Sequence, residues 1–214
     1  MRRAAIIACL MVSTGVALWG ASVRASEIST TTSALARSVL GSTLPVGDYT
    51  LRWFGLRVYE ATLWASEARM PSMTQPVRNA PFDRELVLEL RYAMSLSGER
   101  IAERSDTEMG RQPERASATQ RAAWLAQMKS LFPDVRPGDR LAGAYRPGAA
   151  TRFWLNDKPL GDIADPDFGP AFFGIWLDPR TSQPAMRTAL LRGLGGSAAS
   201  SAGMTDPTKS SGGR

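Results

Sequence analysis

The stretch from Gly138 to Pro179 constrains the fold more than any other part of this chain, because two turn signals divide it. The segments 139–146 and 151–155 have strand-like composition, and Pro147-Gly148 between them favours a tight turn. Asn156-Asp157 predicts a second turn directly after the second segment. The sequence therefore predicts two short strands joined by a turn.

An apolar helix is predicted to follow these strands. Asp165-Pro166 has the form of an N-cap residue followed by a proline in the first helical position, and Gly169-Pro170 offers a second possible start. The helix is too apolar to be exposed, because it contains Phe172, Phe173, Ile175 and Trp176. We therefore expect this helix to be buried.

Alternation of apolar and polar residues indicates three more strands earlier in the chain. They cover residues 49–54, 56–65 and 85–94. In the strand 56–65, residues Tyr59, Ala61 and Leu63 share one face, and Trp64 lies on the other. Helices are predicted over 97–111, 117–132 and 184–194. The order of strands, two helices, strands and helices indicates an α+β protein with an antiparallel sheet and helices packed against one face.

The segment 1–25 has the pattern of a secretory signal peptide. Arg2 and Arg3 precede an uncharged apolar stretch over 4–21, and Val23-Arg24-Ala25 fits a cleavage motif. We expect cleavage after Ala25 and export to the periplasm or the exterior, with no membrane span left in the mature chain. The alternative is an uncleaved anchor, because a span needs roughly 20 apolar residues and this stretch approaches that length.

Composition removes several classes of chemistry. The chain has no histidine, and its single cysteine, Cys9, lies in the predicted signal peptide. A mature chain without either residue excludes disulfides, thiol nucleophiles, Ser-His-Asp triads and His-Cys zinc sites. Three of the 26 basic residues also lie in the segment 1–25, so 23 remain against 20 acidic residues and the formal charge is +3. The arginines are scattered along the chain, which argues against a nucleic-acid partner.

The rest of the chain divides into one domain and two flanking segments. Residues 26–43 begin with a Ser/Thr-rich stretch and are expected to be loosely ordered. Residues 195–214 are mostly Gly, Ser, Thr and Ala, with Met204 as the only large apolar residue, so they are expected to form a disordered tail. Residues 44–194 have the usual size of a domain with a single core.

Three blocks of sequence together resemble the bacterial branch of the chalcone isomerase-like family. They are LRWFGLRVYEATLWAS, LRYAMSLSGERIAERSDTEMGR and FWLNDKPLGDIADPDFGPAFFGIWLDP, and the similarity extends over residues 46–191. The resemblance implies an open-faced β-sandwich, in which a long antiparallel sheet is covered by a helical layer. The family includes enzymes that close a flavanone ring, plant proteins that bind fatty acids, and many bacterial members without known activity.

The resemblance also implies where a site lies. The enzymes of the family use an Arg on an early strand, a Thr on the next strand, and a Tyr and a Lys on the helix after a Thr-Gly turn. In this chain the turn corresponds to Ser97-Gly98, Ile101 takes the place of the Tyr, Arg104 that of the Lys and Tyr59 that of the Thr. Ile has no hydrogen-bonding group and Arg does not release its proton, so these departures argue against isomerase activity.

The set that remains is Arg52 or Arg57, Tyr59 and Arg104. Arginine offers a bidentate fork to a carboxylate and tyrosine adds a neutral donor, so these residues are the candidate ligand-binding site. An apolar ligand tail is expected to lie against Leu88, Leu90, Tyr92 or Met94. The alternative is that the arginines pair with Glu60, Glu103 or Asp106 on a solvated face. The tryptophans at positions 53, 64, 124, 154 and 176 are expected in the core.

These observations favour an exported, non-catalytic protein that binds a small amphipathic carboxylate such as a fatty acid. The alternatives are an isomerase or lyase acting on an enone-like substrate, and a structural or assembly protein of the envelope that docks a partner through the helix near Phe172. No cofactor is expected. No metal is expected either, because Asp162, Asp165 and Asp167 lack the spacing of a calcium loop. The sequence leaves the oligomeric state open.

Overall fold

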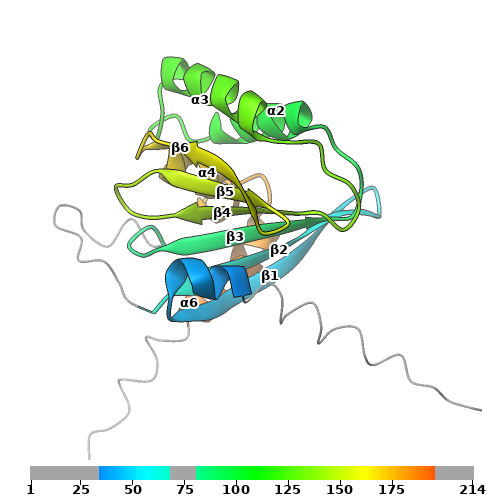
Figure 1. Cartoon of the computed structure of the whole chain (residues 1–214), viewed down its shortest axis with the longest axis vertical. Coiled ribbons are helices and arrows are strands. Elements are labelled where there is room, and N and C mark those ends of the chain that lie inside the picture. Colours follow the sequence, from blue (N-terminus) through cyan, green and yellow to red (C-terminus); the bar gives the residue numbers. More distant parts are fainter. Residues whose placement is uncertain (1–33, 68–80, 196–214) are drawn as a thin grey trace, which may run out of the picture.

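Six antiparallel strands pair in sequence order and form one open sheet (Figure 1). The strands are β1 (Thr43–Trp53), β2 (Leu56–Ser66), β3 (Leu86–Tyr92), β4 (Arg140–Tyr145), β5 (Thr151–Leu155) and β6 (Lys158–Ile163). The computed structural model describes residues 34–67 and 81–195, so the predicted signal peptide and nearly all of the predicted tail lie outside the described residues.

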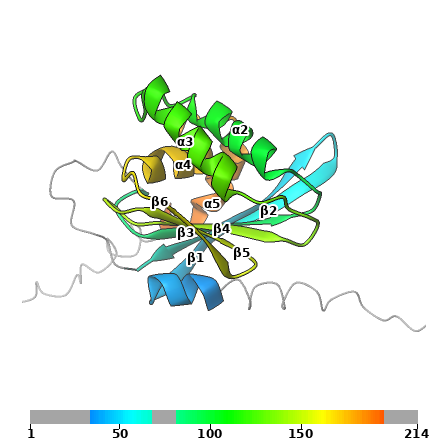
Figure 2. The same ribbon diagram turned by 45° about the horizontal axis from the view of Figure 1, so that its top comes forward.

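A layer of helices covers one face of this sheet (Figure 2). It consists of α2 (Gly98–Met109), α3 (Ala118–Leu131), α4 (Phe168–Leu177) and α5 (Pro184–Leu190), and the short α6 (Arg192–Gly195) contacts β1. Ser97 caps α2 by accepting from the backbone N–H of Arg100, and Ser117 with Gln120 forms a capping box on α3. The predicted α+β architecture, a long antiparallel sheet under a helical layer, is confirmed.

Alternation along the strands separates two apolar clusters. Tyr59, Ala61 and Leu63 point from β2 into the main core under the helices, while Trp64 joins a smaller cluster on the opposite face. A short helix over residues 34–40 packs on that opposite face through Ala36 and Leu40 (Figure 2). The segment 26–43, expected to be loosely ordered, therefore contains a helix and the first residue of β1 in its second half.

The predicted apolar helix is α4, and it forms the centre of the core. Phe168 and Phe172 stack with ring centroids 5.2 Å apart, and both side chains are buried. The helix begins at Phe168, which lies between the two starts that the sequence offered and coincides with neither of them. The carboxylate of Asp165 instead accepts from the backbone N–H of Asp167 at 3.0 Å and from Trp124 Nε1–H at 2.9 Å. Since Phe172 is buried, it is not available to dock a partner.

Strand β6 was not predicted, because Pro159 and Gly161 interrupt its pattern. A proline is tolerated there because β6 pairs only with β5 and forms an edge of the sheet. Asn156 and Asp157, which both have positive φ, make the tight turn between these two strands. Among the helices of the described residues, none combines the length and apolar character that crossing a membrane requires.

Candidate functional site

Tyr59 lies where β2 faces the helices α4 and α5, and it is the centre of the candidate site. Its hydroxyl accepts a hydrogen bond from Trp176 Nε1–H over 3.1 Å. The same hydroxyl donates toward the thioether sulfur of Met186 at 3.9 Å. Its ring packs edge-on against Tyr92, the residue directly opposite on β3, with centroids 5.9 Å apart. The tyrosine side chain is partly buried.

The hydroxyl of Tyr59 is a proton donor over the whole physiological range of pH. Burial raises its pKa to about 12, and the negative charge of Glu108 and the hydroxyl of Tyr49 act in the same direction. The hydrogen bond from Trp176 and the positive charge of Arg104 lower the pKa only partly. The present acceptor of the Tyr59 proton is a thioether, which is a weak one. A stronger acceptor such as a carboxylate oxygen would therefore form a better hydrogen bond with this O–H group.

Near this tyrosine, one glutamate of α2 pairs with two arginines. The side chain of Glu108 on α2 is only 5% exposed and pairs with two arginines. Its Oε1 lies 2.5 Å from Arg104 Nη2, and its Oε2 lies 3.1 Å from Arg111 Nε. Neither contact has hydrogen-bond geometry, so the carboxylate oxygens are held by charge alone. Two guanidinium groups against one carboxylate leave one positive charge to attract an anion.

Apolar side chains lie near this polar group, and Leu51 is the residue opposite Tyr59 in the β1–β2 ladder. Tyr49 and Leu51 on β1 and Ile101 on α2 are partly buried and pack against the main core. Ile101 precedes Arg104 and Glu108 on one face of the helix, since residues three, four and seven positions apart share a face. The site thus combines a neutral donor, a surplus positive charge and an adjoining apolar surface, which suits a carboxylate with an apolar tail.

The structure places the four predicted site residues in two different regions. Tyr59 and Arg104 are close enough for the charge of Arg104 to act on the tyrosine pKa. Arg57 instead pairs with Glu60 at 2.7 Å, and Arg52 donates to the carbonyl of Gly55 at 3.2 Å; both are exposed at the tip of the β1–β2 hairpin. The pairing of Arg57 with Glu60 is the solvated alternative considered above.

Sequence reasoning missed three members of the site: Glu108, Arg111 and Trp176. The signal for Glu108 was present, because it follows Arg104 by four residues and precedes Arg111 by three, which places all three on one helix face. Nothing in the local sequence of Trp176 indicates its hydrogen bond, because its partner Tyr59 is 117 residues away in the chain.

The other candidate residues have structural roles. Leu88, Leu90 and Tyr92, the predicted contacts of an apolar tail, are buried in the main core, whereas Met94 is exposed. Trp53 was expected in the core, but it is 63% exposed, so that prediction was wrong. Asp162 forms a two-point ion pair with Arg152 at 2.9 and 3.0 Å. In the described parts of the chain, no three His, Cys, Asp or Glu side chains are grouped to hold a metal ion.

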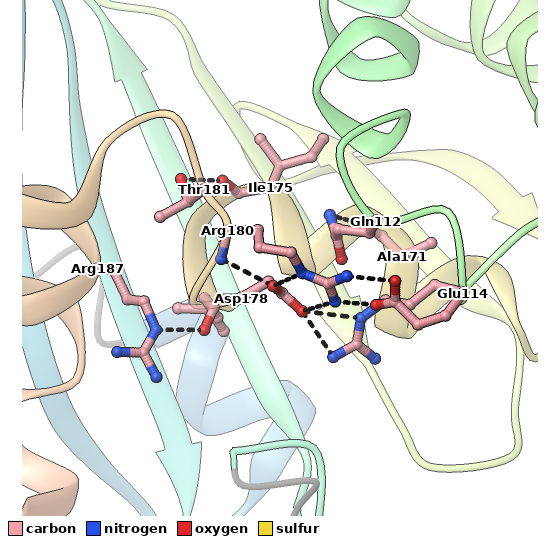
Figure 3. A network of polar contacts seen from close by, with 10 residues as sticks. Gln112, Glu114, Ala171, Ile175, Asp178, Arg180, Thr181 and Arg187 are labelled. Carbon is pink, nitrogen blue, oxygen red and sulfur yellow. Dashed lines mark hydrogen bonds and ion pairs between the residues drawn. The ribbon is translucent and has the colours of Figure 1, made fainter.

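A polar network around Asp178 fixes the end of α4 (Figure 3). The buried carboxylate of Asp178 accepts from the backbone N–H and guanidinium of Arg180 and from Arg115. Burial alone would raise its pKa, but these donors together lower the pKa below its usual value. Glu114 pairs with Arg180 from the other side. The network is filled by the protein's own groups, so it is a structural clamp between α4 and the segment after α2.

A separate hollow of about 480 Å³ lies on the opposite face of the sheet. It is bounded by the helix over residues 34–40 and by the β4–β5 hairpin, and its lining includes Val39, Trp154 and the Arg152–Asp162 pair. It is an open groove, and it does not contain the residues that surround Tyr59.

Comparison with known proteins identifies the family and the fold. The model of the chalcone isomerase-like family matches residues 25–192. The chain belongs to the chalcone isomerase-like family. An uncharacterised protein of Haemophilus influenzae is 28% identical over 147 residues, which is 69% of this chain and 67% of that protein.

Among solved structures, a fatty-acid binding protein of Arabidopsis thaliana has a similar fold. The TM-score is 0.55 at 12% sequence identity, and the match covers 71% of this chain and 87% of the plant chain. At this identity the likeness establishes the shared chalcone isomerase-like fold, and the role of the site in this chain has to be argued from its own residues.

Proposed function

We propose that this protein is an exported, non-catalytic carrier of a small amphipathic carboxylate such as a fatty acid. The observation that carries the proposal is the hydrogen bonding of the Tyr59 hydroxyl. This group donates its proton only to a weak acceptor, the thioether of Met186 at 3.9 Å. Nearby, Arg104 and Arg111 share a single carboxylate, that of Glu108. A ligand carboxylate would take that proton as an acceptor and would meet Arg104 or Arg111 as a counter-charge. The fatty-acid binding neighbour supports the class of ligand.

The apolar tail of the ligand would follow the strip of Tyr49, Leu51 and Ile101. These side chains are partly buried, so part of their apolar surface is still in contact with water. A ligand tail that covers this surface gains a binding free energy of about 25 cal/mol for each Å² removed from water. The strip adjoins the polar group, which fixes the orientation of the ligand with its carboxylate at Tyr59.

The same groups are poorly suited to acid–base catalysis. A tyrosine whose pKa is about 12 does not act as a base near neutral pH. Arg104 keeps its proton at any physiological pH. The position that carries a Tyr in the family's enzymes is Ile101 here, and its hydrocarbon side chain contributes only apolar surface.

Native mass spectrometry of the protein recovered from the periplasm, followed by organic extraction, tests the proposal. We expect a bound fatty acid that is lost in Tyr59→Phe and in Arg104→Ala. Arg100→Ala is the matched control, because Arg100 is an exposed arginine one turn earlier on α2. N-terminal sequencing of the same sample checks cleavage after Ala25.

An empty protein that also fails to take up added oleate would contradict the carrier function. Incubation with chalcones and related enones then decides whether the site performs chemistry instead. Recovery of the protein only from the cytoplasm would contradict the proposed export, independently of ligand binding.

A further inference from the structure

The exposed large apolar side chains of residues 34–67 and 81–195 gather at one end of the sheet. They are Trp53, Phe54, Leu56 and Met94, and Phe54 is the most exposed at 91%. The first three form the tip of the β1–β2 hairpin. Met94 lies at the same end, because the preceding residue, Ala93, donates its N–H to the carbonyl of Val58 on β2. In Figure 2 the hairpin extends past the helical layer, so its tip lies clear of the core.

Phe54 in the turn at this tip is unfavourable in two ways, because its backbone has positive φ and its side chain is exposed. Phe54 and Gly55 have φ of 47° and 80°, so the two-residue loop has positive φ at both positions. Such a turn favours Asn-Gly or Asp-Gly, since a bulky side chain is strained in this region. The ring of Phe54 packs edge-on against Trp53 at 5.1 Å, outside the core. An aromatic residue that strains its turn and stays exposed outside the core indicates a role in binding.

Positive charge surrounds the apolar tip. Arg52 and Arg57 are exposed and lie directly opposite each other on β1 and β2. Arg57 pairs with Glu60, and Arg91 lies across the ladder from that same glutamate. Three arginines against one carboxylate leave this end of the sheet positive.

We propose that the β1–β2 hairpin tip is a membrane-docking element that inserts Trp53, Phe54 and Leu56 into the interface of an anionic lipid bilayer. Tryptophan and phenylalanine prefer the boundary between headgroups and acyl chains. Arginines beside the inserted side chains then meet lipid phosphates, for which guanidinium is well shaped. The inference does not depend on the proposed ligand, because it concerns other residues and requires only a lipid surface.

Flotation of the full chain with vesicles tests the inference. We expect binding to vesicles of equal parts phosphatidylcholine and phosphatidylglycerol, and at least about tenfold weaker binding to phosphatidylcholine alone. Lipids brominated on their acyl chains should quench tryptophan fluorescence in the wild type. In Trp53→Phe that part of the quenching should disappear, so the comparison isolates the tip even where the apolar segment 4–21 also binds lipid.

Phe54→Asn is the decisive variant. Asparagine accepts positive φ, so the variant should have an unchanged or higher melting temperature and yet bind the anionic vesicles about tenfold more weakly. Arg52→Glu with Arg57→Glu should weaken binding similarly. Arg192→Glu makes one such charge reversal, half of the change in the double variant, on α6. Gly193 of α6 packs against Val46 near the other end of β1, so this variant should leave binding unchanged.

Three outcomes would overturn the inference. The wild type could fail to bind anionic vesicles, or the tip variants could bind as well as the wild type. The tip variants could also abolish a dimer seen by analytical ultracentrifugation while leaving vesicle binding intact, which would make the tip a contact between two copies of the chain.

Discussion

The indole Nε1–H of Trp176 on α4 donates to the hydroxyl of Tyr59 on β2 over 3.1 Å, and this bond joins the helical layer to the sheet. It leaves the hydroxyl proton of Tyr59 free to point elsewhere, and Met186 on α5 is the acceptor it reaches. Trp176 therefore fixes the position of the tyrosine oxygen. The tyrosine proton can turn from Met186 to another acceptor without breaking this bond.

The Tyr59–Trp176 bond should be measurable as a coupling free energy. Tyr59→Phe leaves the buried indole N–H without its acceptor, and such a loss destabilises a protein by about 1–3 kcal/mol. Trp176→Phe removes the donor together with part of a buried ring. Urea unfolding of both single variants and the double variant should give a favourable coupling of about 1 kcal/mol. Additive effects of the two substitutions would contradict the hydrogen bond.

The raised pKa of Tyr59 predicts a loss of stability in alkali. A group whose pKa is higher in the folded state stabilises the fold below its unfolded value of 10.0, and that contribution disappears as the pH rises toward about 12. The difference in free energy of unfolding between the wild type and Tyr59→Phe should therefore shrink over this range. Urea midpoints of both proteins at several alkaline pH values measure it, and a constant difference would count against a buried, neutral Tyr59.

Asp178 should have the opposite dependence on pH. Its folded pKa is lowered, so its contribution to stability is present above the unfolded value of 3.8 and is lost as the pH falls below it. Asp178→Asn should reduce the free energy of unfolding at neutral pH by about 2–3 kcal/mol, since it leaves the partly buried Arg115 without its carboxylate. The gap from the wild type should close in acid.

Glu114→Gln is the matched control for this substitution. Glu114 also pairs with Arg180, but its side chain is 51% exposed, and exposed pairs contribute about 0–1 kcal/mol. Equal destabilisation by the two substitutions would show that burial of Asp178 is not what gives the network its strength.

Gly98 should not tolerate a side chain. A Cβ at this first residue of α2 would lie 1.9 Å from the carbonyl oxygen of Phe132, which is backbone and cannot move aside easily. Gly98→Ala should destabilise the protein by about 1–3 kcal/mol in thermal unfolding. In Gly110→Ala the near atom is the end of the Arg121 side chain, at 2.9 Å, so a smaller effect is expected. Equal effects would contradict this account of the Ser-Gly turn.

The sequence predicted the faces of β2 because successive side chains of a strand point to opposite sides of the sheet. Tyr59, Ala61 and Leu63 all belong to the core beneath the helices. Arg104 was indicated by the family resemblance, and its charge does act on Tyr59. Period and spacing are local properties, so they can be read without knowing the fold.

The residues that were misplaced depend on features that are not local. A register shift in the β1–β2 ladder lies between Leu51 and Arg52, and a bulge of this kind re-aims the side chains that follow it. Trp53 was expected in the core because aromatic residues usually are, but the hairpin continues past the helices that would have covered it. How far the helical layer extends over the β1–β2 hairpin depends on the lengths of helices that are distant from the hairpin in sequence.

The partner of Trp176 could not be predicted for the same reason. Its bond to Tyr59 requires the α4 register as well as the β2 face, and the sequence suggested two starts for α4 that both differ from Phe168. A shift of one residue turns a helical side chain by about 100°, so an uncertain start leaves the direction of Trp176 undetermined.

Glu108→Gln tests whether the two arginines beside this glutamate bind an anion. In the wild type one carboxylate offsets two guanidinium groups, and the substitution raises the local surplus from one positive charge to two. A carrier of carboxylates should then bind oleate about fivefold more tightly, which corresponds to about 1 kcal/mol. Glu103→Gln is the control, since Glu103 is half exposed on the same helix and pairs with Lys129 instead. Titration calorimetry with oleate measures both variants. Weaker binding in Glu108→Gln alone would mean that the glutamate itself contacts the ligand, and the anion-binding role of its two arginines would then be wrong.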